Sequence, residues 1–331
     1  MNYSKKLLVL AGFSLLTFVA CQKDSALNQS KIGEEEADIA ALNPTARQCA
    51  SHEYNEALMA ADPQFFAKQQ NIEESTARFV ANYATNVTGR VAVTIPVVVH
   101  VLYRTATENI SDAQIASQIA IMNADYRKLN ADASKVPSNF SGLAADCEIN
   151  FSLVQTIRKA TSVTSFAYTG DPAKKSASGG DDPVSPTTKL NIWVCSLGGG
   201  LLGYAQFPGG AAATDGVVCL NTAFGNTGTA AAPYNKGRTM THEVGHWFNL
   251  RHIWGDKRCG DDLVSDTPTA DAENYGCPAI GKKSLCSGKP VEMWMNYMDY
   301  TDDACMYMFS TGQKARLQAT VVAGGSRSLY K

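Results

Sequence analysis

A short segment, residues 242–252 (HEVGHWFNLRH), has the residue types and the spacing needed to bind a metal ion. His242 and His246 are four residues apart, so on a helix they lie on one face and can hold the same ion. If the chain turns back after this helix, His252 supplies a third nitrogen. Three protein ligands leave one position open, as in a catalytic zinc site, whereas a structural site has four. Glu243 is then placed to move the proton of a water molecule.

The H-E-x-x-H pattern alone also occurs by coincidence on solvated helices, but a third histidine six residues after the second favours a zinc protease. A second segment, residues 295–300 (MNYMDY), looks like the Met-turn of metzincin proteases, with Met298 beneath the metal. Asn249 stands where metzincins usually have a glycine in left-handed conformation at the end of the helix. Because asparagine is the next most tolerant residue in this conformation, the helix can still end there.

These motifs together resemble the pappalysin family of metzincins, particularly its small microbial members, over roughly residues 90–322. The resemblance implies a zinc endopeptidase that hydrolyses protein or peptide substrates. It also implies an α+β fold of the metzincin zincin type. Such a fold has a twisted mixed sheet, a backing helix, an active-site helix and an irregular C-terminal subdomain stapled by disulfides.

The same resemblance assigns roles to two residues after the Met-turn. Tyr300 is placed to donate its phenol to the oxyanion that forms during hydrolysis; the alternative is a core aromatic. In such relatives an aspartate of this stretch lines the S1′ pocket, and Asp303, with Asp302 in reserve, is the candidate here. A buried carboxylate that lacks its cation is costly, so this pocket is expected to select Arg or Lys after the scissile bond.

The flanking sequence contains the elements that position such a site. Residues 94–103 are an apolar run typical of a strand covered on both faces, and a capping box at 111–114 predicts a helix to about residue 129. Further strands are predicted at residues 149–153, 189–197 and 216–220. This order implies a twisted mixed sheet backed by two helices. By resemblance, the glycine-rich residues 198–210 include the upper rim of the cleft, where an extended substrate could pair with a strand edge.

Residues 1–21 are predicted to be an export signal, because two lysines precede an apolar core too short to span a bilayer. Residues 18–21 (FVAC) resemble a bacterial lipobox. A lipid on Cys21 would then tether the protein to a membrane, the outer membrane being the candidate; the alternative is an ordinary signal peptide with a chance cysteine. Either way, we expect an exported bacterial protein, extracellular or at the cell surface, in which disulfides are permitted.

Residues 22–89 are interpreted as a pro-segment and residues 90–331 as the catalytic domain. The pro-segment contains Arg-Gln-Cys at positions 47–49. In relatives with this arrangement the cysteine thiolate, here that of Cys49, fills the open zinc position and keeps the zymogen silent, as suits a strong zinc ligand. The alternative is a structural or free cysteine. With a basic preference, the bond between Gly89 and Arg90 would be a natural site of self-activation.

Beyond His252 the chain holds little apolar material for a core, so disulfides and a hard cation are expected to stabilise it. Four cysteines there allow three pairings, of which the pappalysin resemblance favours Cys259–Cys286 and Cys277–Cys305. Residues 260–268 offer carboxylates, a hydroxyl and carbonyls, which suits Ca²⁺; the alternative is a solvated acidic turn. The candidate calcium ligands are Asp262, Val264, Asp266 and Thr267. The sequence leaves the states of Cys147, Cys195 and Cys219 open.

The composition and charge of the chain limit the kinds of partner that we expect it to bind. The net charge of −2 gives no sign of a nucleic-acid partner, a membrane contact is expected only through Cys21, and we expect a monomer. The competing class is a surface lipoprotein that keeps a structural zinc and is used for binding or adhesion. It would need a fourth protein ligand, and the sequence shows no obvious one. The physiological substrate cannot be read from the sequence.

Overall fold

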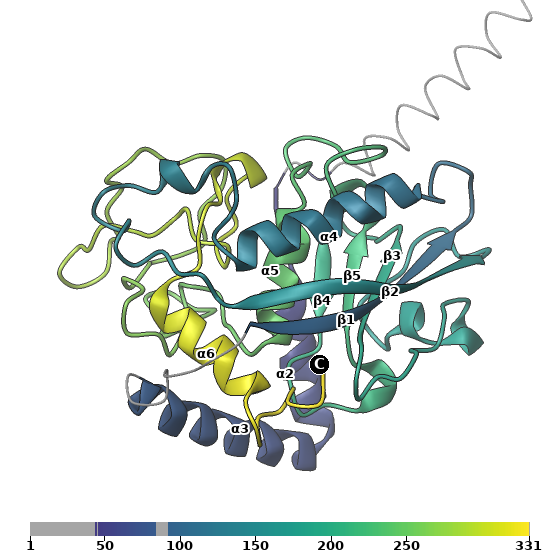
Figure 1. The fold of residues 1–331 in the computed structure, drawn as a ribbon, viewed down its shortest axis with the longest axis horizontal. Helices are drawn as coiled ribbons and strands as arrows, with labels where there is room; N and C mark the ends of the chain where they lie inside the picture. Colours follow the sequence, from purple (N-terminus) through teal and green to yellow (C-terminus); the bar gives the residue numbers. More distant parts are fainter. Residues whose placement is uncertain (1–43, 45, 84–91, 331) are drawn as a thin grey trace, which may run out of the picture. The chain divides into compact units, whose positions relative to one another are not determined.

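The computed structural model describes residues 44, 46–83 and 92–330. The predicted signal, Cys21 and the bond between Gly89 and Arg90 lie outside these residues. A five-stranded sheet has the order β2-β1-β3-β5-β4, and all its neighbours pair in parallel except β4, which runs antiparallel to β5 at one edge (Figure 1). This is the mixed sheet that the sequence predicts. The strands are Val93–Tyr103 (β1), Ile149–Ala160 (β2), Leu190–Cys195 (β3), Gly203–Ala205 (β4) and Val217–Leu220 (β5).

Strand β1 lies inside the sheet, between β2 and β3, and its apolar side chains are buried on both faces. Pro96 has no N–H to give to a ladder, and it lies one residue before a register shift between Val97 and Val98. An irregularity of this kind is where a proline is tolerated within a sheet.

Two helices contact one another and the sheet: α4 (Asp112–Tyr126) packs on β2, and α5 (Arg238–Trp247) packs on β4 and β5. The Ser111 hydroxyl caps α4 by accepting the backbone N–H of Gln114 at 3.1 Å. Helix α4 ends three residues before the predicted position, since Lys128 adopts a left-handed conformation with φ of 54°. The two helices are the backing helix and the active-site helix of the predicted fold.

The described part of residues 22–89, the predicted pro-segment, forms two helices, α2 (Ser51–Ala61) and α3 (Pro63–Ala81). Helix α2 contacts edge strand β4, and α3 packs against the C-terminal helix α6 (Thr311–Val321), as Figure 1 shows. Helix α6 begins with a complete capping box, in which Ser310 and Gln313 each satisfy the other's backbone N–H.

The region after α5 has no long helix or strand until α6. It is held by disulfides between Cys259 and Cys286 and between Cys277 and Cys305, the pairing that the pappalysin resemblance implies. A separate apolar cluster lies here; its members include Phe140, Met293, Trp294, Tyr307 and Met308. Cys49, Cys147, Cys195 and Cys219 are free and buried. Within the described residues, none of the helices has the length and apolar character to cross a bilayer.

Candidate active site

Helix α5 carries the first two histidines, and all ten of its residues are buried. The helix ends at Trp247, and Asn249 takes the left-handed conformation with φ of 74°, as the sequence predicts for the position usually held by glycine. The Leu250 N–H then donates to the carbonyl of Gly245 at 2.9 Å, which closes the helix and reverses the chain. This reversal brings His252 back to the helix.

The three imidazoles face one another. Their Nε2 atoms lie 3.1–3.2 Å apart in each of the three pairs. Each Nδ1 makes a hydrogen bond on the outer side: that of His242 with Tyr297 O at 2.7 Å, that of His246 with Leu250 O at 2.8 Å and that of His252 with an Asp256 carboxylate oxygen. Bonds of this kind fix the tautomer, so the Nε2 lone pairs point inward at one ion.

The charge state of the histidines also suits a cation. Burial, and next the repulsion from neighbouring histidines, holds the pKa of His242 and of His246 well below the ordinary value. Neutral imidazoles are the form that binds zinc. The three neutral histidine nitrogens that face one another are therefore a donor set that fits Zn²⁺.

Cys49, in the predicted pro-segment, offers a fourth atom that could bind the same ion. The Sγ atom of Cys49 and one nitrogen from each histidine all lie within 4.8 Å of one another, and all four residues are buried. Cys49 is the cysteine that the sequence suggests as the ligand of the open position. In the full chain Cys49 faces the corner that the histidines leave open.

Met298 lies directly beneath the histidine helix and is fully buried. A Cβ atom added to Gly245 would lie 2.5 Å from the Met298 Sδ atom, a distance that real Cβ atoms do not show. The helix motif and the Met-turn therefore depend on each other: the glycine between the two histidines leaves room for the methionine.

Glu243 is buried beside the histidines, and burial raises its pKa to about 7. Its Oε2 atom accepts the Ser51 hydroxyl at 2.8 Å and lies 3.3 Å from Cys49 Sγ. The pro-segment thus occupies the carboxylate that the sequence assigns to proton transfer. A carboxyl whose pKa lies near neutrality can both take and return a proton in this range.

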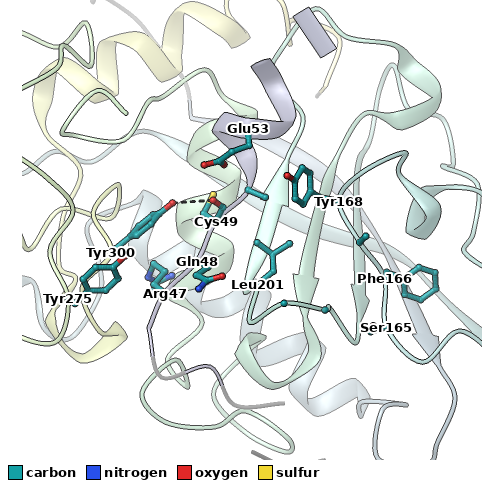
Figure 2. A pocket seen from close by; sticks show the side chains of 14 residues that line it. Arg47, Gln48, Cys49, Glu53, Ser165, Phe166, Tyr168, Leu201, Tyr275 and Tyr300 are labelled. Carbon is teal, nitrogen blue, oxygen red and sulfur yellow. Dashed lines mark hydrogen bonds between the residues drawn. The ribbon is translucent and has the colours of Figure 1, made fainter. Parts of the chain in front are cut away.

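Tyr300 stands over the site from the Met-turn side. Its ring packs against His242 and His252, and its hydroxyl donates to the backbone carbonyl of Cys49 at 3.2 Å, as the dashed line in Figure 2 shows. The group that Tyr300 contacts is thus a peptide carbonyl held next to the histidine cluster. This is the kind of atom that becomes an oxyanion in peptide hydrolysis.

The pro-segment lies along the edge of the sheet. Cys49 forms a parallel bridge with Gly203 of β4, through Leu202 N–H to Gln48 O at 2.9 Å and Ala50 N–H to Gly203 O at 3.2 Å. Beside this segment a cleft of about 650 Å³ extends from Tyr275 and Tyr300 to Tyr168 (Figure 2). The segment predicted to be the upper rim therefore contains the edge strand that pairs with an extended peptide.

Asp303 is fully buried and receives a cation from the pro-segment. Arg47, itself 1% exposed, places its Nη2 atom 2.6 Å from Asp303 Oδ1. The other Asp303 oxygen accepts the backbone N–H groups of Lys236 at 2.8 Å and Arg238 at 3.2 Å. Asp302, the reserve candidate, lies outside this contact.

The rest of the Arg47 pocket completes a site for a guanidinium group. Arg47 Nη1 donates to the Thr239 hydroxyl at 3.1 Å, and its guanidinium carbon lies 5.0 Å from the ring centre of Tyr234. Sequence reasoning missed the place of Arg47, although the residue is part of the quoted Arg-Gln-Cys motif. The sequence signal that could have indicated this contact is the position of Arg47, two residues before Cys49.

The expected calcium loop brings oxygens together around one hydroxyl. The Thr267 Oγ1 atom lies 2.9 and 2.8 Å from the two Asp262 carboxylate oxygens and 2.8 Å from Val264 O. Burial raises the pKa of Asp262 to about 7. Asp266 faces helix α6 instead, where it accepts the Ser310 hydroxyl at 2.7 Å and the Gly312 N–H at 2.8 Å.

Three histidines face one another, two on buried helix α5 and His252 after it; we call them the histidine cage. With the methionine turn beneath them and the mixed sheet beside them, they define a metzincin-type zinc metalloprotease. The comparisons with known proteins agree. The Peptidase_M43 family model, described as "Pregnancy-associated plasma protein-A", matches residues 185–322. A curated relative, the "Extracellular metalloprotease" of Pyricularia oryzae, is 34% identical over 241 residues, covering 69% of this chain and 75% of the relative. "Extracellular metalloprotease 1" of Coccidioides posadasii is 35% identical over 219 residues, covering 63% and 69%.

Solved structures extend the comparison. Mature mirolysin of Tannerella forsythia in complex with a cleaved peptide is similar, with a TM-score of 0.71 and 44% identity over 73% of this chain and 96% of that chain. A promirolysin mutant of the same organism has a TM-score of 0.78 and 40% identity over 86% of this chain and 97% of that one. This chain belongs to the pappalysin family of metzincin proteases and is a zinc metalloendopeptidase. Its relatives are extracellular, and the longer match to promirolysin supports a zymogen.

Proposed function

We propose that the chain is the zymogen of an exported endopeptidase in which His242, His246 and His252 hold the catalytic Zn²⁺. Zinc bound there supplies a Lewis acid, which makes water acidic enough to attack at neutral pH and polarises the scissile carbonyl. Glu243 takes the proton of the attacking water and then delivers it to the leaving amine. Tyr300 donates its phenol to the oxyanion. The contact between Tyr300 and the Cys49 carbonyl supports this last role.

The specificity is for Arg or Lys at P1′, with Asp303 as the selecting residue. The observation that carries this proposal is the burial of Arg47 against Asp303 in the full chain. Because a guanidinium group already fits the pocket with a carboxylate, a hydroxyl and an aromatic face around it, the free pocket suits a basic substrate side chain. Without a cation the buried Asp303 carboxylate is left uncompensated, so neutral side chains bind less well.

The segment that contains Arg47 also keeps the zymogen inactive. Cys49 fills the open corner of the cage, Ser51 engages Glu243, and Arg47 fills the specificity pocket. Each group that hydrolysis needs is thereby occupied by the chain itself. We place the boundary of the pro-segment at residue 89, with cleavage between Gly89 and Arg90 as the activating step, since that bond presents Arg at P1′.

Two finer assignments complete the proposal. A Ca²⁺ ion in the loop of residues 260–268 would compensate the buried Asp262 carboxylate, with Val264 O and the Thr267 hydroxyl beside it; Asp266 would have to turn from α6 to join them. At the N-terminus, residues 1–21 direct export, and a lipid on Cys21 would anchor the protein at the outer membrane.

Glu243→Ala tests the mechanism. The variant is expected to bind zinc as the parent does and to lose proteolysis, because only the proton carrier is gone. Zinc content is measured by elemental analysis, and hydrolysis by mass mapping of products from a denatured protein mixture. Hydrolysis at the parent rate would refute the role of Glu243. A parent protein without zinc after activation would refute the metal site itself.

Asp303→Asn tests the specificity separately. The amide keeps an oxygen for the two backbone N–H groups but removes the negative charge, so the preference for Arg and Lys at P1′ is expected to fall at least tenfold. Asp302→Asn is the matched control, since it removes a neighbouring negative charge while the ion pair of Arg47 is with Asp303. An unchanged set of cleavage sites in Asp303→Asn would overturn the assignment.

A further inference from the structure

Tyr54, in the first turns of α2, fills a second pocket of the catalytic domain. Its side chain is 3% exposed, and its ring meets Tyr204 of edge strand β4 edge-on at a centroid distance of 5.3 Å. Its hydroxyl donates to the Asp171 carboxylate and lies 3.3 Å from Gln206 Oε1. The contact is therefore specific for a phenol, with an aromatic wall and polar acceptors at the far end.

The floor of this pocket is a buried ion pair. Lys174 is completely buried; its ammonium lies 3.2 Å from Asp171 Oδ1 and donates to Thr214 O at 2.8 Å. The same ammonium lies 5.0 Å from the ring centre of Tyr54 and 4.9 Å from that of Tyr204. The loop that contains Asp171 and Lys174 turns inward here, so both side chains are buried.

The Tyr54 pocket and the Arg47 pocket are filled by residues that flank Cys49 in the chain. Arg47 and Tyr54 stand on either side of Cys49 along the chain, and Tyr204 directly follows Gly203, the bridge partner of Cys49. Figure 2 shows Cys49 between Arg47 and Tyr168, and Tyr168 packs near Tyr204 with ring centres 6.4 Å apart. If the Arg47 pocket receives P1′, the Tyr54 pocket is on the side that receives residues before the scissile bond.

Removal of the pro-segment takes Tyr54 out of this pocket. The Asp171 carboxylate then loses its phenol donor, and Lys174 loses one aromatic face. Both groups are held in place by their contacts within the catalytic domain, so they remain as a prepared site for an incoming phenol. A phenylalanine would fill the same volume but leave the carboxylate without its donor, which is the costly case.

We propose that the Tyr54 pocket is a substrate subsite, which in the activated enzyme takes a tyrosine side chain on the N-terminal side of the scissile bond. This inference rests on the proposed function and adds a second specificity to it. Tyr54 is then an internal stand-in for a substrate residue, as Arg47 is on the other side of Cys49 in the chain.

The test uses the full chain, loaded with zinc and activated by cleavage of its pro-segment, on a peptide library with Arg fixed at P1′. Tyrosine is expected to be enriched at one position before the scissile bond. For a matched pair of peptides with Tyr or Phe there, kcat/KM is expected to be about tenfold higher for Tyr, the effect of one hydrogen bond to a charged group.

Asp171→Asn is expected to bring the ratio of the two peptides close to one while cleavage before Arg continues. Asparagine tolerates the left-handed conformation of position 171, where φ is 53°. Asp182→Asn, an exposed carboxylate of the same loop, is the matched control and keeps the ratio. If Asp171→Asn does not fold, the peptide pair on the parent enzyme decides alone. Cleavage before Arg without a Tyr preference overturns the subsite only; no cleavage at all overturns the proposed function and the subsite with it.

Discussion

Asp256 determines the orientation of the third imidazole. Its carboxylate accepts the Nδ1–H of His252, while Trp254 stacks on the same ring at a centroid distance of 4.4 Å with the planes 7° apart. His252 is therefore fixed by a hydrogen bond at one edge and by an aromatic face. The other two histidines use backbone carbonyls for this purpose, so Asp256 is the partner that a substitution can remove.

Asp256→Asn is expected to weaken zinc binding about 10- to 100-fold, because the carboxylate that orients the ligand and raises its basicity is lost. Asparagine is compatible with the positive φ of 57° at this position. Competition with a chelator of known affinity measures the change, and Asp182→Asn is a remote control. Equal zinc affinity in the two variants would show that Asp256 has no positioning role.

At this scale the sequence is informative where the chemistry is local. His242, His246, His252 and Glu243 lie within eleven residues, and a spacing of four on a helix is enough to bring two ligands together. Arg47 and Asp303 meet across a separation of 256 residues. No pattern in one sequence reports such a contact, and only the family resemblance suggested Asp303.

Helix α5 packs closely on the Met-turn at Gly245. An added Cβ atom there would lie 2.5 Å from the buried Met298 sulfur, and the Met298 backbone is held by the Ile253 N–H, which donates to its carbonyl at 3.3 Å. In an exposed helix, replacing glycine by alanine stabilises the fold by about 1 kcal/mol. At position 245 alanine is expected to destabilise the fold instead, because its Cβ atom would meet the Met298 sulfur.

Gly245→Ala is expected to lower the free energy of unfolding by about 1–3 kcal/mol, as for overpacking in other cores. Chemical denaturation of the zinc-loaded chain measures it. Gly142→Ala is the matched control, because a Cβ atom there meets nothing within 4 Å. A Gly245→Ala protein as stable as the parent would show that the Met-turn yields to the helix.

Element prediction succeeded where pattern and cap agreed. The apolar run of residues 94–103 predicted β1, and the Ser111 cap predicted the start of α4. The end of α4 was wrong by three residues, since nothing in the local pattern marks Lys128 as left-handed. Strand β4 has only three residues. It exists because β5 and the pro-segment pair with it, and this is information that lies elsewhere in the chain.

In the whole molecule, the pro-segment is held at two distant places. One is the cleft, through residues 47–54. The other is helix α3, where Glu73 accepts Arg316 Nη2 at 2.9 Å and Asn249 Nδ2 at 2.9 Å. Arg316 belongs to α6 and Asn249 ends the histidine helix, so Glu73 ties the pro-segment to the frame of the active site. Asn249, which stands where metzincins usually have a glycine, thus makes a hydrogen bond to Glu73 through a side chain that glycine lacks.

Glu73→Gln should loosen this second attachment. The Arg316 guanidinium is 2% exposed and would lose its carboxylate, which is unfavourable for a buried charge. We expect the pro-segment to detach more often and the zymogen to be processed several-fold faster, as followed by the appearance of the mature chain with time. Glu74→Gln is the control on the same helix, since Glu74 is 68% exposed and its ion pair at 3.7 Å is with Arg78 of the same helix. If both variants mature at the same rate, latency depends on the contacts in the cleft alone, and the packing of α3 on α6 contributes nothing to it.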